Sequence, residues 1–201
     1  MHKIWLVLAA FCLIAAPLGA SAQTAVPTPA PEDRVLGKAD APITIIEYAS
    51  LTCPHCAEFD KDTHPKIKQD WIDTGKAKLI YRDFPLDGLA LRAAMLARCA
   101  PPERYFAFID TLFQSQQSWA RNDWEPALGR IAKLGGMSEE QFKKCMSDEA
   151  LGNAVVQMRT TAANEYGVES TPTFFINGTK LLGAAAYPVF DKALSTAQPK
   201  T

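Results

Sequence analysis

The sequence predicts an α/β fold in which a small sheet is interrupted by a block of helices, and three observations support this. An apolar, β-branched run at 43–48 leads directly into a Cys-x-x-Cys motif and then into helical spacing. From residue 88 to 167 the apolar residues recur at helical intervals. After Gly167, two short strands around an Asn-Gly turn precede a last helix.

Composition limits the classes of protein to consider. The 201 residues suit one domain, or one domain that carries a large insertion, and a hydrophobic share of 48% is ample for a core. The formal net charge is −1, and no basic stripe interrupts the sequence. Nucleic acid is therefore not expected as a partner.

Residues 1–22 have the pattern of a secretory signal peptide. Lys3 supplies the positive start, 4–16 is apolar, and Ala20-Ser21-Ala22 fits a cleavage site, so cleavage is expected after Ala22. An uncleaved membrane anchor is the alternative, but the apolar stretch is short against the roughly 20 residues of a membrane span. A lipoprotein reading is disfavoured because bulky Phe11 precedes the cysteine of this segment.

The segment 23–34 is predicted to be a flexible or polyproline-like linker without a core, since Pro27, Pro29 and Pro31 stand among small and polar residues. The run 43–48 is the first strong strand. Its apolar residues are almost continuous, which is typical of a strand covered on both faces.

Glu47 breaks that apolar run, and two readings are open. It is an edge or end-of-strand residue in water, or it is a carboxylate beneath the two cysteines. In the second reading burial would raise its pKa and allow it to hold or pass a proton.

Helical spacing continues from 56 to 71, where Pro65 should kink or divide the helix. The next segment, 78–84, has no helical period and is bracketed by Gly75 and Pro85. It is predicted to be the second strand.

The block 88–167 carries several amphipathic stripes that are expected to form a helical core. A double glycine stops the third stripe, and Ser138 with Gln141 reads as a capping box that opens the next helix. The stripe residues are Leu89, Ala93, Leu96 and Ala100; Phe106, Ile109 and Phe113; Trp124, Leu128, Ile131 and Leu134; and Val155, Met158, Ala162 and Tyr166.

A hairpin is expected after this block. Residues 173–176 are apolar, Asn177-Gly178 is a strong type I′ turn signal, 180–182 forms the returning strand, and 187–197 is a final helix. Asn177-Gly178-Thr179 also matches a glycosylation acceptor, but the turn is favoured because both of its central residues need positive φ.

The Cys-x-x-Cys motif points to redox chemistry. Cys53 stands at the expected helix cap, Pro54 suits the first helical position, and Cys56 lies in the first turn. The thiolate is the reactive form of cysteine, and a helix N-terminus favours negative charge. The dipole alone lowers a thiol pKa by roughly one unit, so N–H···S bonds, or a protonated His55, are needed to go further.

Cleavage of the leader removes Cys12 and leaves four cysteines, which allow three disulfide pairings. We expect 53–56 together with 99–145. In the chain-entropy model, closing the loop from Cys99 to Cys145 stabilises the fold by roughly 4 kcal/mol, whereas the small ring at 53–56 offers far less. The 53–56 bridge is therefore expected to take part in redox chemistry, and the 99–145 bridge is expected to stabilise the fold.

The segment Ser170-Thr171-Pro172-Thr173-Phe174 resembles the cis-proline loop of the thioredoxin superfamily. Together with the intervening helical block and Cys53-Pro54-His55-Cys56, it makes 35–197 similar to the DsbA-type periplasmic thiol:disulfide oxidoreductases. The resemblance implies a thioredoxin-like α/β fold with an inserted helical domain. Residues 35–87 and 168–197 would form the two parts of the thioredoxin-like unit, and residues 88–167 would form the inserted helical domain.

The resemblance also implies roles for the motif residues. Cys53 would be the exposed nucleophile and Cys56 its partner, while Pro54 and His55 would tune the reduction potential. Glu47, six residues before Cys53, falls where the family places its buried acid.

The loop residues Thr171 and cis-Pro172 would face the disulfide and hold substrate backbone. The implied function is an exported oxidase that introduces disulfides into reduced secreted or periplasmic proteins. It would be reoxidised by a DsbB-like membrane partner. No cofactor is expected, the expected location is the periplasm, and a monomer is the default expectation for the oligomeric state.

Three rival readings remain. The first is a periplasmic reductase or isomerase on the same fold, since those branches also place threonine before the cis-proline; the short, Pro-rich 23–34 argues against a dimeric isomerase. The second is a metal-binding module with Cys53, Cys56, His55 and His64, disfavoured because zinc knuckles usually come in pairs. The third is an exported binding protein whose disulfides are both structural.

Overall fold

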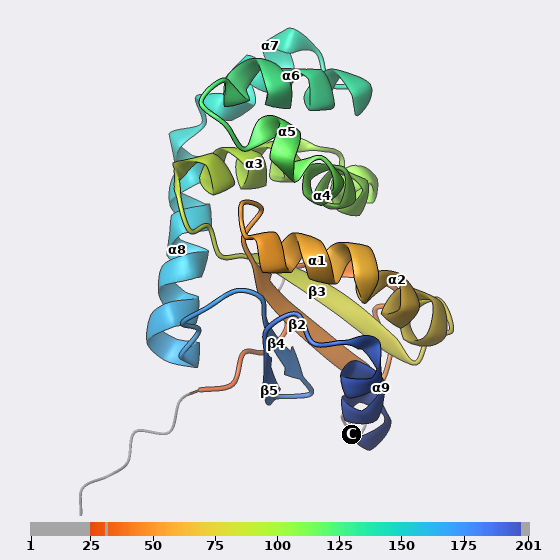
Figure 1. Ribbon diagram of the computed structural model, residues 1–201. Coiled ribbons are helices and arrows are strands. Elements are labelled where there is room, and N and C mark those ends of the chain that lie inside the picture. Colours follow the sequence, from red (N-terminus) through yellow and green to blue (C-terminus); the bar gives the residue numbers. More distant parts are fainter. Residues whose placement is uncertain (1–24, 31, 198–201) are drawn as a thin grey trace, which may run out of the picture.

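A five-stranded mixed sheet runs through the computed structural model, which describes residues 25–30 and 32–197 (Figure 1). The predicted signal peptide, 1–22, lies outside the described residues. The strand order is β1-β3-β2-β4-β5, with β2 and β3 parallel and the other neighbours antiparallel. The strands are β1 (Arg34–Leu36), β2 (Ile43–Ala49), β3 (Ala77–Asp83), β4 (Thr173–Ile176) and β5 (Thr179–Leu182).

The helices fall into two groups. Beside the sheet lie α1 (Pro54–Asp62), α2 (His64–Ile67), the π-helical turn η1 (Lys68–Ile72), the long α8 (Glu149–Tyr166) and α9 (Tyr187–Thr196). The inserted block at the top of Figure 1 contains α3 (Gly88–Cys99), the 3-10 turn η2 (Pro102–Arg104), α4 (Tyr105–Gln114), α5 (Gln116–Trp119), α6 (Trp124–Leu134) and α7 (Glu139–Met146). The sheet is thus built from both ends of the chain, as predicted.

Alternation along β2 divides the core of the sheet into two layers. Ile43 and Ile45 pack with residues of α1, η1 and α9, whereas Ile46 and Tyr48 pack with residues of α8 and β3. All seven residues of β2 are buried, in agreement with a strand covered on both faces. By the same alternation Glu47 lies on the face of Ile45, which α1 covers.

The helix predicted over 56–71 is divided, as expected from Pro65. Helix α1 ends at Asp62, and Thr63, whose N–H bonds to the Phe59 carbonyl, separates it from α2. Pro65 lies in the first turn of α2, where its missing N–H costs little.

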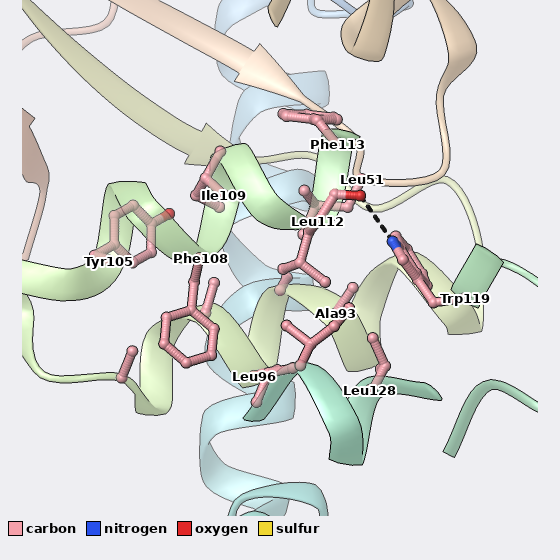
Figure 2. Packing of buried hydrophobic residues seen from close by; sticks show 14 of the residues in the cluster. Leu51, Ala93, Leu96, Tyr105, Phe108, Ile109, Leu112, Phe113, Trp119 and Leu128 are labelled. Carbon is pink, nitrogen blue, oxygen red and sulfur yellow. Dashed lines mark hydrogen bonds between the residues drawn. The ribbon is translucent and has the colours of Figure 1, made fainter. Parts of the chain in front are cut away.

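The inserted block has its own core, shown in part in Figure 2. Trp119 is fully buried, and its Nε1 donates to the Leu112 carbonyl at 2.7 Å (Figure 2). The prediction that Leu134 belongs to this core is wrong, since the residue is 85% exposed. Helix α6 ends there, and Gly135 approaches Phe108 so closely that an added Cβ would lie 2.1 Å from the ring.

Two local signals are confirmed by the backbone. Ser138 and Gln141 form the reciprocal hydrogen bonds of a capping box at the start of α7. Asn177 and Gly178 have φ of 44° and 92° in the turn between β4 and β5, which is the positive φ that the hairpin requires.

The N-terminal segment differs from the expected linker. The Ala25 N–H donates to the Glu165 carbonyl, and β1 already begins at Arg34. Arg82, buried on β3, donates to the Thr28 carbonyl and pairs with Asp33 at 2.8 Å. A buried guanidinium needs such partners, so the described part of 23–34 is held against the body of the protein.

No helix within residues 25–30 and 32–197 is long and apolar enough to cross a membrane.

Candidate active site

The two cysteines of the motif lie at the N-terminus of α1. Cys53 is the cap residue, with extended φ and ψ of −75° and 121°, and Pro54 is the first helical residue. Cys56 is completely buried inside the first turn. Both are free thiols, so the structure presents the reduced form of the pair that we expected as a disulfide.

Cys53 is not the exposed residue that we predicted, because only 5% of it is accessible. The Thr171–Pro172 loop, whose peptide bond is cis as the resemblance implied, covers it. The Cys53 Sγ donates to the Thr171 carbonyl at 3.4 Å. The structure thus brings together the nucleophile and the loop, which are 118 residues apart in sequence.

The environment of Cys53 favours its thiolate. Hydrogen bonding from the Cys56 thiol is the largest cause that lowers the Cys53 pKa, to about 5, against an opposing effect of burial. The Thr171 hydroxyl and the backbone N–H groups of Cys56 and His55 add to the lowering. A thiolate has no proton to give to the Thr171 carbonyl, whereas the buried Thr171 hydroxyl has no other partner and is available to donate to the sulfur.

Cys56 behaves in the opposite way. Burial, then the Cys53 sulfur and the charge of Glu47, raise its pKa well above the ordinary value of a thiol. At neutral pH the site therefore holds one thiolate and one thiol. The negative charge is on the Cys53 sulfur, which the loop faces, and the proton stays on the Cys56 sulfur.

Glu47 is 4% exposed in the central strand, which rules out the reading of an edge residue in water. Burial raises its pKa well above the usual range, and the charge of Asp60 raises it further. Glu47 in turn raises the pKa of Cys56 through its charge, so the charge of the carboxyl affects the protonation of the buried thiol.

Comparison with known proteins identifies the family. The sequence profile described as Thioredoxin matches residues 29–196. The crystal structure of alpha-DsbA1 from Wolbachia pipientis is 38% identical, with a TM-score of 0.80 over 84% of this chain and 92% of that one. The chain belongs to the DsbA family of thioredoxin-like proteins. The oxidised form of BdbD from Bacillus subtilis is also similar, at 25% identity and a TM-score of 0.77 over 87% and 97% of the two chains.

Curated sequences extend the comparison of this DsbA-family chain. A Rickettsia bellii protein named as a protein-disulfide oxidoreductase is 35% identical over 148 residues, which are 73% of this chain and 57% of that protein. The chain thus spans little more than half the length of the Rickettsia relatives it matches.

His55, which is predicted to tune the reduction potential of this DsbA-family site, has its side chain in solvent. Its imidazole is exposed and its Nδ1 lies 3.3 Å from the Glu58 carboxylate. The influence of His55 on Cys53 comes through its backbone N–H. The side chain points to solvent because its position in the first turn of α1 faces away from the sheet.

Sequence reasoning missed Gln116. From the start of α5, its Nε2 donates to the carbonyl oxygens of Leu51 at 2.8 Å and Cys53 at 3.0 Å. The inserted block therefore holds the segment that presents the nucleophile. No local pattern announces such a contact, because a glutamine in a polar stretch is ordinary.

The other predicted residues lie apart from the dithiol. Cys99 and Cys145 form a disulfide that joins α3 to α7 inside the inserted block. His64, a ligand in the rival metal-binding reading, groups with Asp60 and Asp110 rather than with the two cysteines. The structure does not assemble that rival site.

Proposed function

We propose that this chain is an exported thiol:disulfide oxidoreductase that donates disulfides to reduced secreted or periplasmic proteins. One observation carries the proposal: the two thiols have opposite protonation preferences, with the Cys53 pKa lowered to about 5 and that of Cys56 raised. Similarity to alpha-DsbA1 and BdbD supports it.

The reaction begins with the oxidised pair. A substrate thiolate attacks the Cys53 sulfur and forms a mixed disulfide, the 53–56 bond breaks, and its electron pair leaves with the Cys56 sulfur, which takes a proton. A second substrate thiolate then attacks the substrate sulfur and releases Cys53 as a thiolate. Two electrons pass from the substrate to the enzyme; of two substrate protons, one stays on Cys56 and one goes to solvent.

Side chains around the pair have separate tasks. Glu47, buried on the sheet face under α1, exchanges the Cys56 proton. Thr171 stabilises the leaving Cys53 thiolate, and the loop at Pro172 holds the substrate backbone beside the sulfur. Pro54 starts the helix without spending a hydrogen bond.

The lowered Cys53 pKa favours the direction of oxidation. At pH 7 an ordinary thiol is protonated, so only the part of the Cys53 pKa shift that lies below pH 7 stabilises the thiolate. With a pKa of about 5, this part is about two units. This stabilises the reduced enzyme by at most about 2.7 kcal/mol, or ~60 mV in reduction potential, less any solvent screening. After the transfer a DsbB-like membrane protein would reoxidise the pair.

The deciding measurement is the equilibrium reduction potential of the 53–56 pair in the chain from residue 23 onward, titrated against glutathione. We expect a value near or above that of the glutathione couple, and a reduced protein more stable than the oxidised one. A value close to thioredoxin's ~−270 mV would contradict the oxidase and favour a reductase. Cell fractionation and size exclusion would test the periplasmic location and the monomer.

A further inference from the structure

A group of metal-ligating side chains lies outside the dithiol site, where α1 and α2 meet the inserted block. Asp60 is near the end of α1, His64 is the first residue of α2, and Asp110 is on α4. One possible ligand atom from each residue lies within 4.8 Å of the other two. The thiol exchange described above uses none of these three residues directly.

His64 is buried without the hydrogen bonds that a buried imidazole needs. It is 9% exposed, and its Nε2 has no partner anywhere in residues 25–30 and 32–197. Its Nδ1 lies 3.7 Å from Asp60 Oδ1, which is longer than a hydrogen bond. A buried polar atom left unpaired is costly, and Nδ1, the nitrogen beside the Asp60 carboxylate, is the one that an ion shared with that carboxylate would bind.

The charge in the group is also unbalanced. Two carboxyl groups, those of Asp60 and Asp110, lie beside one imidazole. The nearby Lys68 does not balance them, because its Nζ is held by Asp73 at 2.7 and 2.8 Å. A cation at this place would offset the repulsion between the two carboxylates.

One member of the group, Asp60, lines a groove that is open to solvent. This groove of about 770 Å³ lies between α1 and the segment from α4 to α5, and its other lining residues are mostly polar; His64 and Asp110 do not line it. An ion could enter there and keep water molecules as its remaining ligands.

We propose that Asp60, His64 and Asp110 form a binding site for one divalent transition-metal ion of the zinc class. An imidazole with carboxylates suits such an ion, whereas calcium and magnesium prefer oxygen ligands alone. Ligand atoms at about 2.1 Å from zinc are roughly 3.4 Å from one another. Side-chain rotations that move the ligand atoms by about 1 Å would therefore bring all three to coordination distance. The ion would join α1 and α2 to α4, and so the thioredoxin-like unit to the insertion.

The test is titration of the oxidised protein with zinc ion alone, because a closed 53–56 disulfide removes the competing thiolates. Calorimetry should give one zinc per chain, and zinc should raise the melting temperature. H64Q and D110N should each weaken binding at least tenfold and lose the zinc-dependent rise. The control D62N, which changes an exposed carboxylate on the same helix, should keep both.

A second measurement does not depend on the variants' folding. Cobalt bound to the wild-type oxidised protein should show d–d bands without the strong sulfur-to-metal absorption, as nitrogen and oxygen ligands require. The absence of saturable zinc binding would overturn the proposal. So would unchanged zinc affinity in H64Q and D110N, or its loss in H55Q, which would place the ion beside Glu58.

Discussion

Replacing Thr171 by valine tests how the loop stabilises the Cys53 thiolate. The change keeps the shape of the side chain and removes the buried hydroxyl, which is the second-largest cause lowering the Cys53 pKa, after the Cys56 thiol. A hydrogen bond to a charged group contributes ~1.5 kcal/mol at the lower end, or about one pKa unit. We therefore expect T171V to raise the Cys53 pKa from about 5 to about 6.

The assay is the thiolate absorbance near 240 nm, or the rate of alkylation, followed against pH. At pH 6 the thiolate fraction should fall from about 90% to about 50%. At pH 7 the reduced form loses about 1.3 kcal/mol, which lowers the reduction potential by ~30 mV.

The matched control is T52V. Thr52 is next to Cys53, but its hydroxyl bonds to Asp87 at 2.7 Å and to Ser50, not to the sulfur. This variant should leave the Cys53 pKa unchanged. If T171V shifts that pKa by less than about 0.3 unit while T52V behaves as expected, the Thr171 hydroxyl does not donate to the thiolate and the reasoning fails.

Three more variants test other parts of the structure. Glu47 keeps its proton above pH 4.5 in the folded protein, whereas in the unfolded chain it loses the proton near that pH. Its contribution to the free energy of unfolding is therefore present below pH 4.5 and is lost as pH rises towards the raised pKa. Denaturation curves of E47Q, measured at several pH values, should lack this fall in stability with pH. Stopped-flow oxidation of a reduced peptide by E47Q should slow on the order of 100-fold, since the partner thiol loses its proton donor. Q116A should reduce the free energy of unfolding by about 1–2 kcal/mol, through two lost hydrogen bonds, while Q117A on the exposed side of the same helix should change it by less than ~0.5. D33A should cost about 3–5 kcal/mol in urea unfolding because it leaves the buried Arg82 unpaired, and D33A/R82M should recover most of that loss; an equally unstable double variant would show that the ion pair is not the cause.

Much of the fold could be predicted because its elements carry local signals. The buried strand β2, the division of the helix near Pro65 and the Asn177-Gly178 turn each follow from residues close together in sequence. Strand β1 could not be predicted, since three residues show no periodicity. Its neighbourhood is fixed by Asp33 and Arg82, which are 49 residues apart.

The site was predictable where a motif names the residue and not where a contact decides its environment. Spacing and family resemblance led to Cys53, Cys56 and Glu47. The burial of Cys53 depends on a loop that is 118 residues away in sequence. The hydrogen bond from Gln116 to the Cys53 carbonyl joins residues that are 63 apart. Such distances in sequence leave no local trace, so the structure was needed.

The place of β4 in the sheet has a consequence for biosynthesis. Strand β2 pairs with β3 on one edge and with β4 on the other, and β4 is made after the whole insertion. A chain emerging N-terminus first therefore presents an unpaired edge of β2, a strand whose residues are mostly apolar, until residue 176 has been added. During that interval the nascent chain has its reactive cysteines but no loop to shield them, so it is most exposed to aggregation and to unwanted disulfides just before it can act.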